Sequence, residues 1–414
     1  MKVPGYIKKI IKKIENNNHE AYIVGGACRD FLMGKKPIDY DLTTSALPSE
    51  IKEIFKKYKL FNYGEKHGTI SIYINKNEVQ VTTYRIENNY SDNRHPDKVE
   101  FLKDLKEDLS RRDFTMNAIA YNKEFIDYFN GLNDINQKNI KTVGNSNSRF
   151  EEDALRIMRA LRFSVNLDFK IEEETKKGIL NNYHLVKNIS KERVRDELIK
   201  MLTFGDYSKV VEEYFEIFAF IFNGIQDINV DDFLENIKSV NKEKLKEADD
   251  YIIRIAIFLN LMFGYQKNDL NRVEEKLKEL CFSKKNIYEI LLIMENIFIK
   301  IDNDEITLKK LLNKYGYNIL NKIIKSKYYF SEKLEDVIFL NKILKTIKKI
   351  ERKKICYSMD SLKIDGNDLK EIGYKKREIQ TVKEKLLDKV ISNELKNNKK
   401  SIIKYLEENK NSIS

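Results

Sequence analysis

The distribution of proline constrains the fold of this chain more than any other feature. All four prolines among its 414 residues lie in the first 96 positions, at Pro4, Pro37, Pro48 and Pro96, and residues 97–414 contain none. Proline interrupts helix interiors, whereas the Lys, Leu, Glu and Ile residues that fill the rest of the chain are compatible with helices. The sequence therefore predicts a mixed α/β head followed by an all-helical remainder.

Charge and cysteine content narrow the class of protein. The 76 Lys and Arg against 65 Asp and Glu residues give a net charge of +11, which suits a polyanion such as RNA, although a Lys-, Asn- and Ile-rich compositional bias also explains it. The three cysteines, Cys28, Cys281 and Cys356, are widely spaced and odd in number, which argues against a disulfide framework. With no signal peptide and no long apolar run, we expect a soluble cytoplasmic protein without a membrane partner.

A glycine pair and an acidic pair stand close together near the start of the chain. A short apolar run ends at Gly25 and Gly26, and a helix-prone segment carrying Arg29 in its first turn follows. Glycines let the backbone approach a ligand closely, and a helix N-terminus offers free N–H groups to phosphate. This order of elements is typical of a nucleotide site, although a Gly-Gly before a helix is often only a turn.

The acidic pair is Asp39 and Asp41. Side chains two residues apart in a strand project to the same side, so both carboxylates would face one point if this segment is extended. Two converging carboxylates favour Mg²⁺, which prefers hard oxygen ligands. The alternative is a solvated strand end, the commoner meaning of an isolated Asp-x-Asp.

Periodicity predicts the other elements of the head. Residues 4–17 carry isoleucines on one helical face, and Ser49 could cap a helix running to about residue 57. Residues 66–74 and 79–85 alternate as two strands, joined at 75–77 in a hairpin. Residues 86–97 are polar and lack periodicity, which predicts a mobile loop.

Arginines recur in two later segments. Residues 111–113 read Arg-Arg-Asp, and Arg156, Arg159 and Arg162 form a slanting stripe along a helix expected from residue 150 onward. The simplest explanation of the stripe is an exposed ion-pair surface. The sharper one is base recognition by Asp153 and Arg156: cytosine and adenine both present an amine beside a ring acceptor, whereas uracil and guanine present a carbonyl beside an N–H.

Taken in order, these motifs resemble the class II nucleotidyltransferases, which include the tRNA CCA-adding enzymes and the bacterial poly(A) polymerases. Residues 111–118 match the family's Arg-Arg-Asp-Phe-Thr-x-Asn-Ala pattern residue for residue, and residues 152–156 match its Glu-Asp-x-x-Arg pattern. Residues 189–202 resemble its last motif, and residues 361–373 with Asn397 resemble the tail of the bacilli-type enzymes. The resemblance implies a head at 1–142, a neck at 143–203, a body at 204–300 and a tail at 301–414.

The resemblance also implies a reaction: addition of CMP, CMP and AMP to tRNA 3′ ends from CTP and ATP, with release of pyrophosphate. Asp39 and Asp41 would be catalytic and hold two Mg²⁺ ions, Asp113 would organise the site, and Asp153 with Arg156 would choose the base. The residues implied in holding the remainder of the nucleotide are Gly26, Arg29, Arg112, Arg159 and Arg162.

One position departs from the family pattern. Gln80 stands where the family has a third active-site acid, and Glu78, two residues earlier, would face the same way and could replace it. The alternatives that stay open are an A-adding or poly(A) polymerase of the same family and a tRNA-binding protein of weakened activity. The sequence also leaves open whether the protein forms a homodimer. Basic clusters at 309–310 and 348–354 could contact RNA phosphates or be solvated helix faces.

Overall fold

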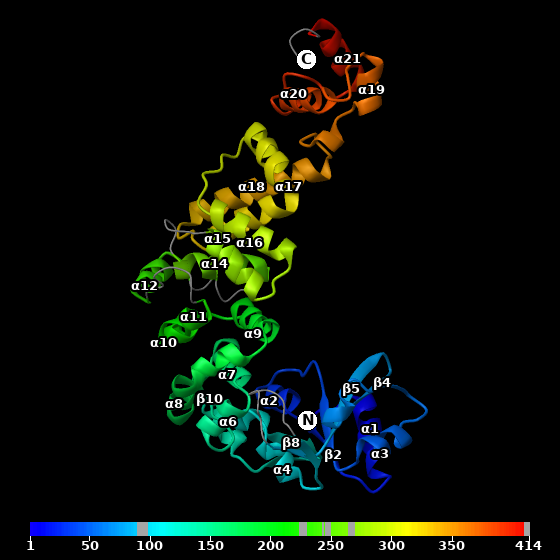
Figure 1. Ribbon diagram of the computed structural model, residues 1–414, viewed down its shortest axis with the longest axis vertical. Coiled ribbons are helices and arrows are strands. Elements are labelled where there is room, and N and C mark those ends of the chain that lie inside the picture. Colours follow the sequence, from blue (N-terminus) through cyan, green and yellow to red (C-terminus); the bar gives the residue numbers. More distant parts are fainter. Residues whose placement is uncertain (89–97, 223–229, 242–243, 245–249, 264–269, 410–414) are drawn as a thin grey trace. The chain divides into compact units, whose positions relative to one another are not determined.

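The computed structural model describes residues 1–88, 98–222, 230–241, 244, 250–263 and 270–409. The chain divides into two compact units, Met1–Asn223 and Gly224–Ser414 (Figure 1). The finer division into head, neck, body and tail stays a prediction.

The first unit begins with a seven-stranded sheet of order β3-β4-β5-β2-β1-β8-β9, coloured blue to cyan in Figure 1. Strand β2 pairs parallel with β5, and the other neighbours pair antiparallel. The strands are β1 Ala21–Val24, β2 Asp41–Thr44, β3 Lys59–Phe61, β4 Thr69–Ile74, β5 Asn77–Thr83, β8 Ile119–Asn122 and β9 Glu124–Asp127.

The first predicted helix and the predicted hairpin are both confirmed. Helix α1 (Gly5–Glu15) buries the four isoleucines Ile7, Ile10, Ile11 and Ile14. Strands β4 and β5 are joined by Asn75 and Lys76, both with positive φ, as a tight hairpin turn requires. The first of the two predicted strands begins later than expected, because residues Glu65–His67 form a 3₁₀ turn.

Two details of the head were predicted wrongly. Ser49 does not cap α3 (Pro48–Ile54): Leu47 occupies the N-cap position, and the Glu50 side chain accepts a hydrogen bond from its backbone N–H at 2.7 Å. The segment expected to be a loop begins as strand, because β6 (Arg85–Asn88) pairs with β7 (Lys98–Phe101). The rest of that segment, residues 89–97, lies outside the described residues.

Helices complete the first unit after the sheet. They are α2 Gly26–Leu32, α4 Leu105–Ser110, α5 Gly131–Asn136, α6 Ser146–Glu152, α7 Leu155–Leu167, α8 Glu173–Asn182, α9 Lys191–Thr203, α10 Ser208–Glu213 and α11 Phe215–Ile221. One short strand interrupts the predicted all-helical part: α7 ends at Asp168 in the left-handed region, the chain reverses, and β11 (Lys170–Ile171) pairs with β10 (Asn139–Ile140). Ser190 precedes α9 as expected, but its side chain makes no capping hydrogen bond.

All the regular elements in the described residues of the second unit are helices. Its helices are α12 Val230–Lys238, α14 Tyr251–Phe263, α15 Leu270–Glu279, α16 Lys284–Asn296, α17 Glu305–Tyr328, α18 Leu334–Arg352, α19 Gly366–Glu371, α20 Ile379–Ile391 and α21 Lys399–Glu408. Helix α17 is kinked at Gly316, whose φ of 74° suits glycine. The last three helices share a core that includes Leu369, Leu386 and Leu406.

The tail motif is tied together by Asn397. Its side-chain amide donates to the Ser361 carbonyl at 2.9 Å and accepts from the Lys363 N–H at 2.9 Å, so the two matching stretches of sequence meet. The expectation for Lys309 was wrong, because its side chain is buried and bonds Glu305 and Asn393. Lys348, Lys349 and Arg352 on α18 are exposed, as a phosphate contact requires.

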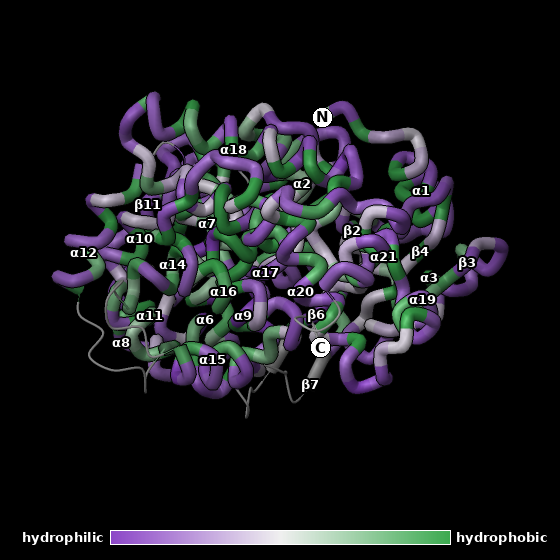
Figure 2. Tube along the Cα trace, turned by 90° about the horizontal axis from the view of Figure 1, so that it is seen from above, coloured by the Kyte–Doolittle hydropathy of each residue, from purple (hydrophilic) through white to green (hydrophobic). Residues whose placement is uncertain are grey.

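Apolar and polar residues are interspersed along the helices (Figure 2), and helices such as α1 bury their apolar face. No helix in the described ranges is both long enough and apolar enough to cross a bilayer. None of Cys28, Cys281 and Cys356 takes part in a disulfide within the described part of the chain.

Candidate active site

The turn between β1 and α2 forms one wall of the candidate site. Gly25 has a φ of 71°, and a Cβ placed on it would lie 3.3 Å from Nη1 of Arg112. A Cβ on Gly26 would lie 3.6 Å from Nη2 of Arg29. The missing side chain at Gly25 lets the Arg112 guanidinium lie close to the backbone, and the Arg29 guanidinium lies at ordinary contact distance from Gly26, so two cations that can bind phosphate border the turn.

The acidic pair lies beside this turn. Strand β2 pairs with β1 in a register that sets Asp41 opposite Val24, the residue immediately before Gly25. Asp41 is the first residue of β2, and Asp39 lies in the connection before it, so the expectation that both belong to one strand was wrong. Both residues are exposed, which leaves their carboxylates open to a ligand.

The electrostatics of Asp41 fit a cation site. Although the residue is exposed, nearby protein atoms remove part of the water around its carboxylate, and this desolvation is the main reason that its pKa is raised. The neighbouring charge of Asp39 raises the pKa further, while Arg112 opposes the shift. A divalent cation between the two carboxylates would relieve this repulsion.

The missing third acid is not replaced in this structure. Gln80 directly precedes Val81, which pairs with Leu42, so Gln80 occupies the position on β5 next to Asp41 and on the same face of the sheet. Glu78 lies further along β5, opposite Tyr73 of β4. Across the described part of the chain, no three acidic, His or Cys residues are grouped to hold a metal ion, so Glu78 does not join the pair here.

Asp108 holds the Arg-Arg pair, and sequence reasoning missed it. Its buried carboxylate accepts hydrogen bonds from Nε and Nη2 of Arg111 at 3.0 and 2.8 Å, and lies 3.6 Å from Nη2 of Arg112. Thr43 of β2 donates to the same carboxylate at 2.9 Å. Burial alone would raise the pKa of Asp108, but the two arginines more than offset it and the pKa is lowered. The sequence held one indication of this role: Asp108 precedes Arg111 by three residues and Arg112 by four, the spacing at which side chains meet on a helix.

Arg112 itself keeps unused hydrogen-bonding capacity. Its Nε is buried and has no hydrogen-bond partner within the described residues. A buried guanidinium N–H without an acceptor is costly, and a bound anion would satisfy it. The position of Arg112 against Gly25 therefore suits the predicted contact with an incoming nucleotide.

Asn117 and Asp113 connect the glycine turn to α7. Arg29 donates from Nη1 to the Asn117 side-chain oxygen at 3.0 Å, and the Asn117 amide donates to Asp113 at 3.0 Å. Arg159 donates to the other Asp113 oxygen from Nε and Nη2 at 2.8 and 2.6 Å. This network joins residues that lie far apart in sequence and fixes α2 against α7.

The charge of Asp113 is stabilised within this network. Burial alone would raise its pKa, but Arg159, Asn117 and the Phe114 backbone N–H together lower the pKa to about 2. The unfolded pKa is about 3.9, so the folded state binds fewer protons in acid. The resulting stabilisation is complete above the unfolded pKa and is lost as the pH falls from about 4 to about 2.

We therefore expect the free energy of unfolding to fall in acid, and we expect Asp113 to be responsible for part of that fall. In urea unfolding, the free-energy difference between the wild type and Asp113→Asn is expected to shrink by about 2 kcal/mol as the pH is lowered from about 5 to about 2. Glu107→Gln, which changes an exposed carboxylate on α4, is the matched control and should show no such dependence. A difference that does not vary with pH would contradict the assignment.

The proposed base-reading pair is positioned differently from expectation. Asp153 has extended φ and ψ between α6 and α7, so the single helix predicted from residue 150 is broken there. One of its carboxylate oxygens accepts from the Leu155 N–H at 3.1 Å, and the other lies 3.4 Å from Nη2 of Arg193. A side chain that bonds its own backbone two residues onward favours such a break over a continuous helix.

Arg156 is largely enclosed by protein acceptors. It is 7% exposed and donates to Glu152 at 2.7 Å and to the carbonyls of Arg149 and Arg111 at 3.1 and 2.9 Å. These bonds fix the guanidinium between α6 and the Arg111–Arg112 segment. Its role in reading a base stays a prediction.

Arg159 and Arg162 do not form an exposed stripe. Each pairs with a carboxylate distant in sequence, Arg159 with Asp113 and Arg162 with the buried Glu197 of α9. Desolvation lowers the pKa of Arg162, while Arg159 is stabilised in its charged form chiefly by Asp113. The interpretation as a solvated ion-pair surface was wrong, because both are tertiary ion pairs: Arg159 joins α7 to the Arg-Arg-Asp segment, and Arg162 joins α7 to α9.

Comparison with known proteins identifies the family. Residues 21–141 match the family described as "Poly A polymerase head domain", and residues 168–227 match "Probable RNA and SrmB- binding site of polymerase A". A CCA-adding enzyme of Staphylococcus haemolyticus is 34% identical over 410 residues, which covers 97% of each chain. This chain belongs to the CCA-adding enzymes.

Further relatives agree with this membership. The CCA-adding enzyme of Enterococcus faecalis is 48% identical over 195 residues, or 47% of this chain and 48% of that one. The crystal structure of the Bacillus stearothermophilus CCA-adding enzyme in complex with CTP covers 99% of this chain and 98% of its own, with a TM-score of 0.83 and 26% identity. The predicted family, the α/β head with a largely helical remainder, and a nucleotidyltransferase activity are thus confirmed.

Proposed function

We propose that this CCA-adding enzyme attaches CMP, CMP and AMP in succession to the 3′ end of tRNA in the cytoplasm, using CTP and ATP and releasing pyrophosphate. One observation carries the proposal: the register of β1 and β2 places Asp41 beside the Gly25–Gly26 turn, against which Arg112 and Arg29 lie. Phosphate-binding groups and a carboxylate pair thus occupy one site. The related enzyme from Bacillus stearothermophilus was solved in complex with CTP, which supports CTP as a substrate.

Asp39 and Asp41 are the residues that would hold Mg²⁺. Their carboxylates are exposed, hard oxygen donors, and the raised pKa of Asp41 reflects a site that gains from a cation. A bound Mg²⁺ would lower the pKa of the primer 3′-hydroxyl and neutralise the triphosphate leaving group. Gln80, next to Asp41, offers an amide oxygen in place of the family's third acid and cannot act as a base.

The chain's own residues would orient the nucleotide. Arg112 and Arg29 at the glycine turn would hold phosphates, with Gly26 leaving room for them, and Arg159 with Arg162 would lie toward the triphosphate. Asp153 would accept from the amine of cytosine or adenine, and Arg156 would donate to the adjacent ring acceptor. The selection of C and A then needs no nucleic-acid template.

The acceptor RNA is proposed from charge and from the family. The net charge of +11 and the exposed cations Lys348, Lys349 and Arg352 suit a phosphate backbone. The match of residues 168–227 to a family described as a probable RNA-binding site supports the same partner.

The deciding experiment measures incorporation of each labelled nucleotide, with Mg²⁺, onto tRNA ending at the discriminator base, onto tRNA ending in CC, and onto an unstructured RNA. Addition of C, C and A to tRNA, followed by arrest, is the expected result. Addition of A alone to CC ends, or long A tails on any RNA, would replace the proposal with an A-adding or poly(A) polymerase. Tight tRNA binding without transfer would replace the proposal with a tRNA-binding protein.

A further inference from the structure

Three arginines converge on one aromatic ring at the junction of α2 and α7. The guanidinium carbons of Arg29, Arg159 and Arg162 lie 5.0, 5.4 and 4.0 Å from the centroid of the Phe163 ring. Arg29 lies in the last turn of α2, and the other two arginines belong to α7. Such distances are within the range of cation–π attraction.

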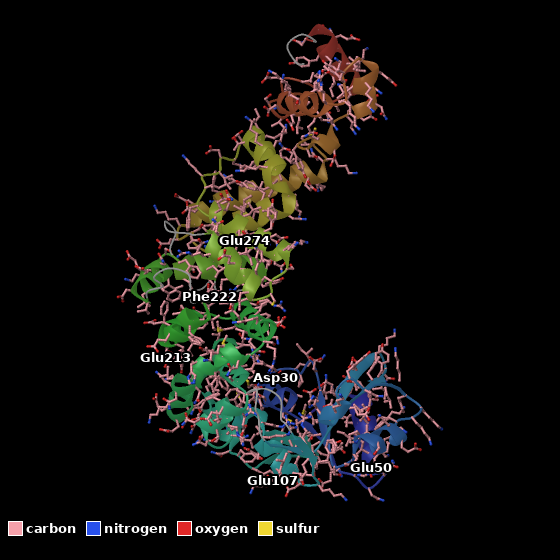
Figure 3. The ribbon with its side chains drawn as sticks, viewed as in Figure 1. Asp30, Glu50, Glu107, Glu213, Phe222 and Glu274 are labelled. Atoms are coloured by element: carbon pink, nitrogen blue, oxygen red, sulfur yellow. The ribbon has the colours of Figure 1, made fainter. Side chains whose placement is uncertain are left out.

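Carboxylates fix the other side of each arginine. Arg29 pairs with Asp30 at 2.7 Å, Arg159 pairs with Asp113, and Arg162 pairs with Glu197; Asp30 is labelled in Figure 3. Each guanidinium group is therefore held between an acid and the ring, so the three like charges can gather without a ligand.

The cluster still offers donors to an anion. Arg159 bonds Asp113 through Nε and Nη2, and Arg162 bonds Glu197 through Nε. Among the hydrogen bonds of the described residues, none engages Nη1 of Arg159 or either Nη of Arg162. These outer N–H groups suit the oxygens of a polyphosphate.

The ring itself is held rigidly. Phe163 is 5% exposed and meets the fully buried Phe114 edge-on, with centroids 5.9 Å apart and an interplanar angle of 90°. Phe114 directly follows Asp113, the partner of Arg159. A leucine could fill similar space at position 163, but it lacks the negative ring face that attracts cations.

We propose that Phe163 is a positioning residue for the triphosphate of the incoming nucleotide, because its ring holds Arg29, Arg159 and Arg162 as one preorganised cluster. The inference rests on the proposed function, since it assigns this cluster to the phosphate end of CTP or ATP. It predicts an effect on phosphate binding that is the same for every nucleotide, and none on the choice of base.

The test compares Phe163→Leu, Phe163→Tyr and the wild type in the full chain. For Phe163→Leu, the KM for CTP and for ATP is expected to rise about tenfold, with a kcat that changes far less. Inhibition by inorganic tripolyphosphate, which has no base, should weaken by the same factor. The ratio of kcat/KM for CTP over UTP should stay unchanged, and Phe163→Tyr, which keeps the ring, should restore phosphate binding.

Phe150→Leu is the matched control, because Phe150 of α6 is buried as Phe163 is, and the arginine contacts found among the described residues fall on Phe163 instead. Thermal unfolding of each variant establishes that it folds, and Phe163→Met replaces Phe163→Leu if the latter does not. Unchanged tripolyphosphate binding in the Leu or Met variant, an equal loss in Phe150→Leu, or failure of a folded Phe163→Tyr to restore binding would each overturn the inference. A wild type that binds tripolyphosphate without transferring nucleotides would overturn the proposed function alone.

Discussion

Replacing Asp41 by asparagine is expected to lower the rate of nucleotide transfer by at least about 10³-fold, because it removes a charged ligand of the proposed metal pair. Asparagine is nearly isosteric with aspartate and keeps one side-chain oxygen, so a loss of transfer rate would result from the missing charge rather than from a change of shape. Since Asp41 is exposed at the start of β2, the fold should survive the change. The measurement is single-turnover incorporation of CTP onto tRNA, together with tRNA affinity in a binding assay.

The control for Asp41→Asn is Glu53→Gln on α3, which removes an exposed carboxylate of the same head that pairs with Lys56. It should transfer nucleotides at the wild-type rate. Affinity of Asp41→Asn for tRNA should match the wild type, since the acids are proposed to hold metal rather than RNA. Transfer by Asp41→Asn within about tenfold of the wild type would refute the assignment of the metal pair.

The second large effect is expected on the choice of base. Asparagine at position 153 can donate an N–H to the uracil carbonyl, which the aspartate repels, and it accepts less strongly from the cytosine amine. The ratio of kcat/KM for CTP over UTP should therefore fall by about 10²-fold in Asp153→Asn. Competition between labelled CTP and UTP on tRNA ending at the discriminator base measures this ratio directly.

Asp153 also accepts a hydrogen bond from the N–H of Leu155, the first residue of α7, and lies near Arg193, so its replacement has a structural component. Asp196→Asn, at an exposed position on α9, controls for loss of a neck carboxylate and should leave the ratio unchanged. Tripolyphosphate inhibition separates the two parts of the site: it should be unaffected in Asp153→Asn. A uniform loss with both nucleotides and no change in their ratio would count against base reading by this residue.

Local features of the site could be predicted because they depend on neighbouring residues. The Gly25–Gly26 turn, the turn at Asn75 and Lys76, and the buried face of α1 each follow from short-range spacing. Even here the boundary of β2 was misjudged, since Asp39 lies outside the strand. Strand ends depend on pairing with β1 and β5, which the local pattern does not record.

The partners of charged side chains could not be predicted in the same way. Arg159 bonds Asp113 across 46 positions of sequence, and Arg162 bonds Glu197 across 35. From helical spacing alone we predicted that these arginines lie on an exposed surface. Periodicity shows which residues share a helix face, but it does not show which other element packs against that face. Asp108 was overlooked for a related reason. Its carboxylate is buried and accepts a hydrogen bond from Thr43, and this contact between residues far apart in sequence forms only in the folded sheet.

The order of strands in the head has a consequence for synthesis on the ribosome. Strand β1 lies between β2 and β8, yet Ile23 meets its partner Tyr121 only after the intervening segment has been translated, and Arg162 must wait for Glu197. At about 5–20 residues per second, roughly 10 to 35 seconds separate the emergence of β1 from that of α9. During this interval the nascent chain carries the acidic pair without Arg159 and Arg162 and exposes the unpaired edge of an apolar strand, a state that favours aggregation until the rest of the first unit has been made.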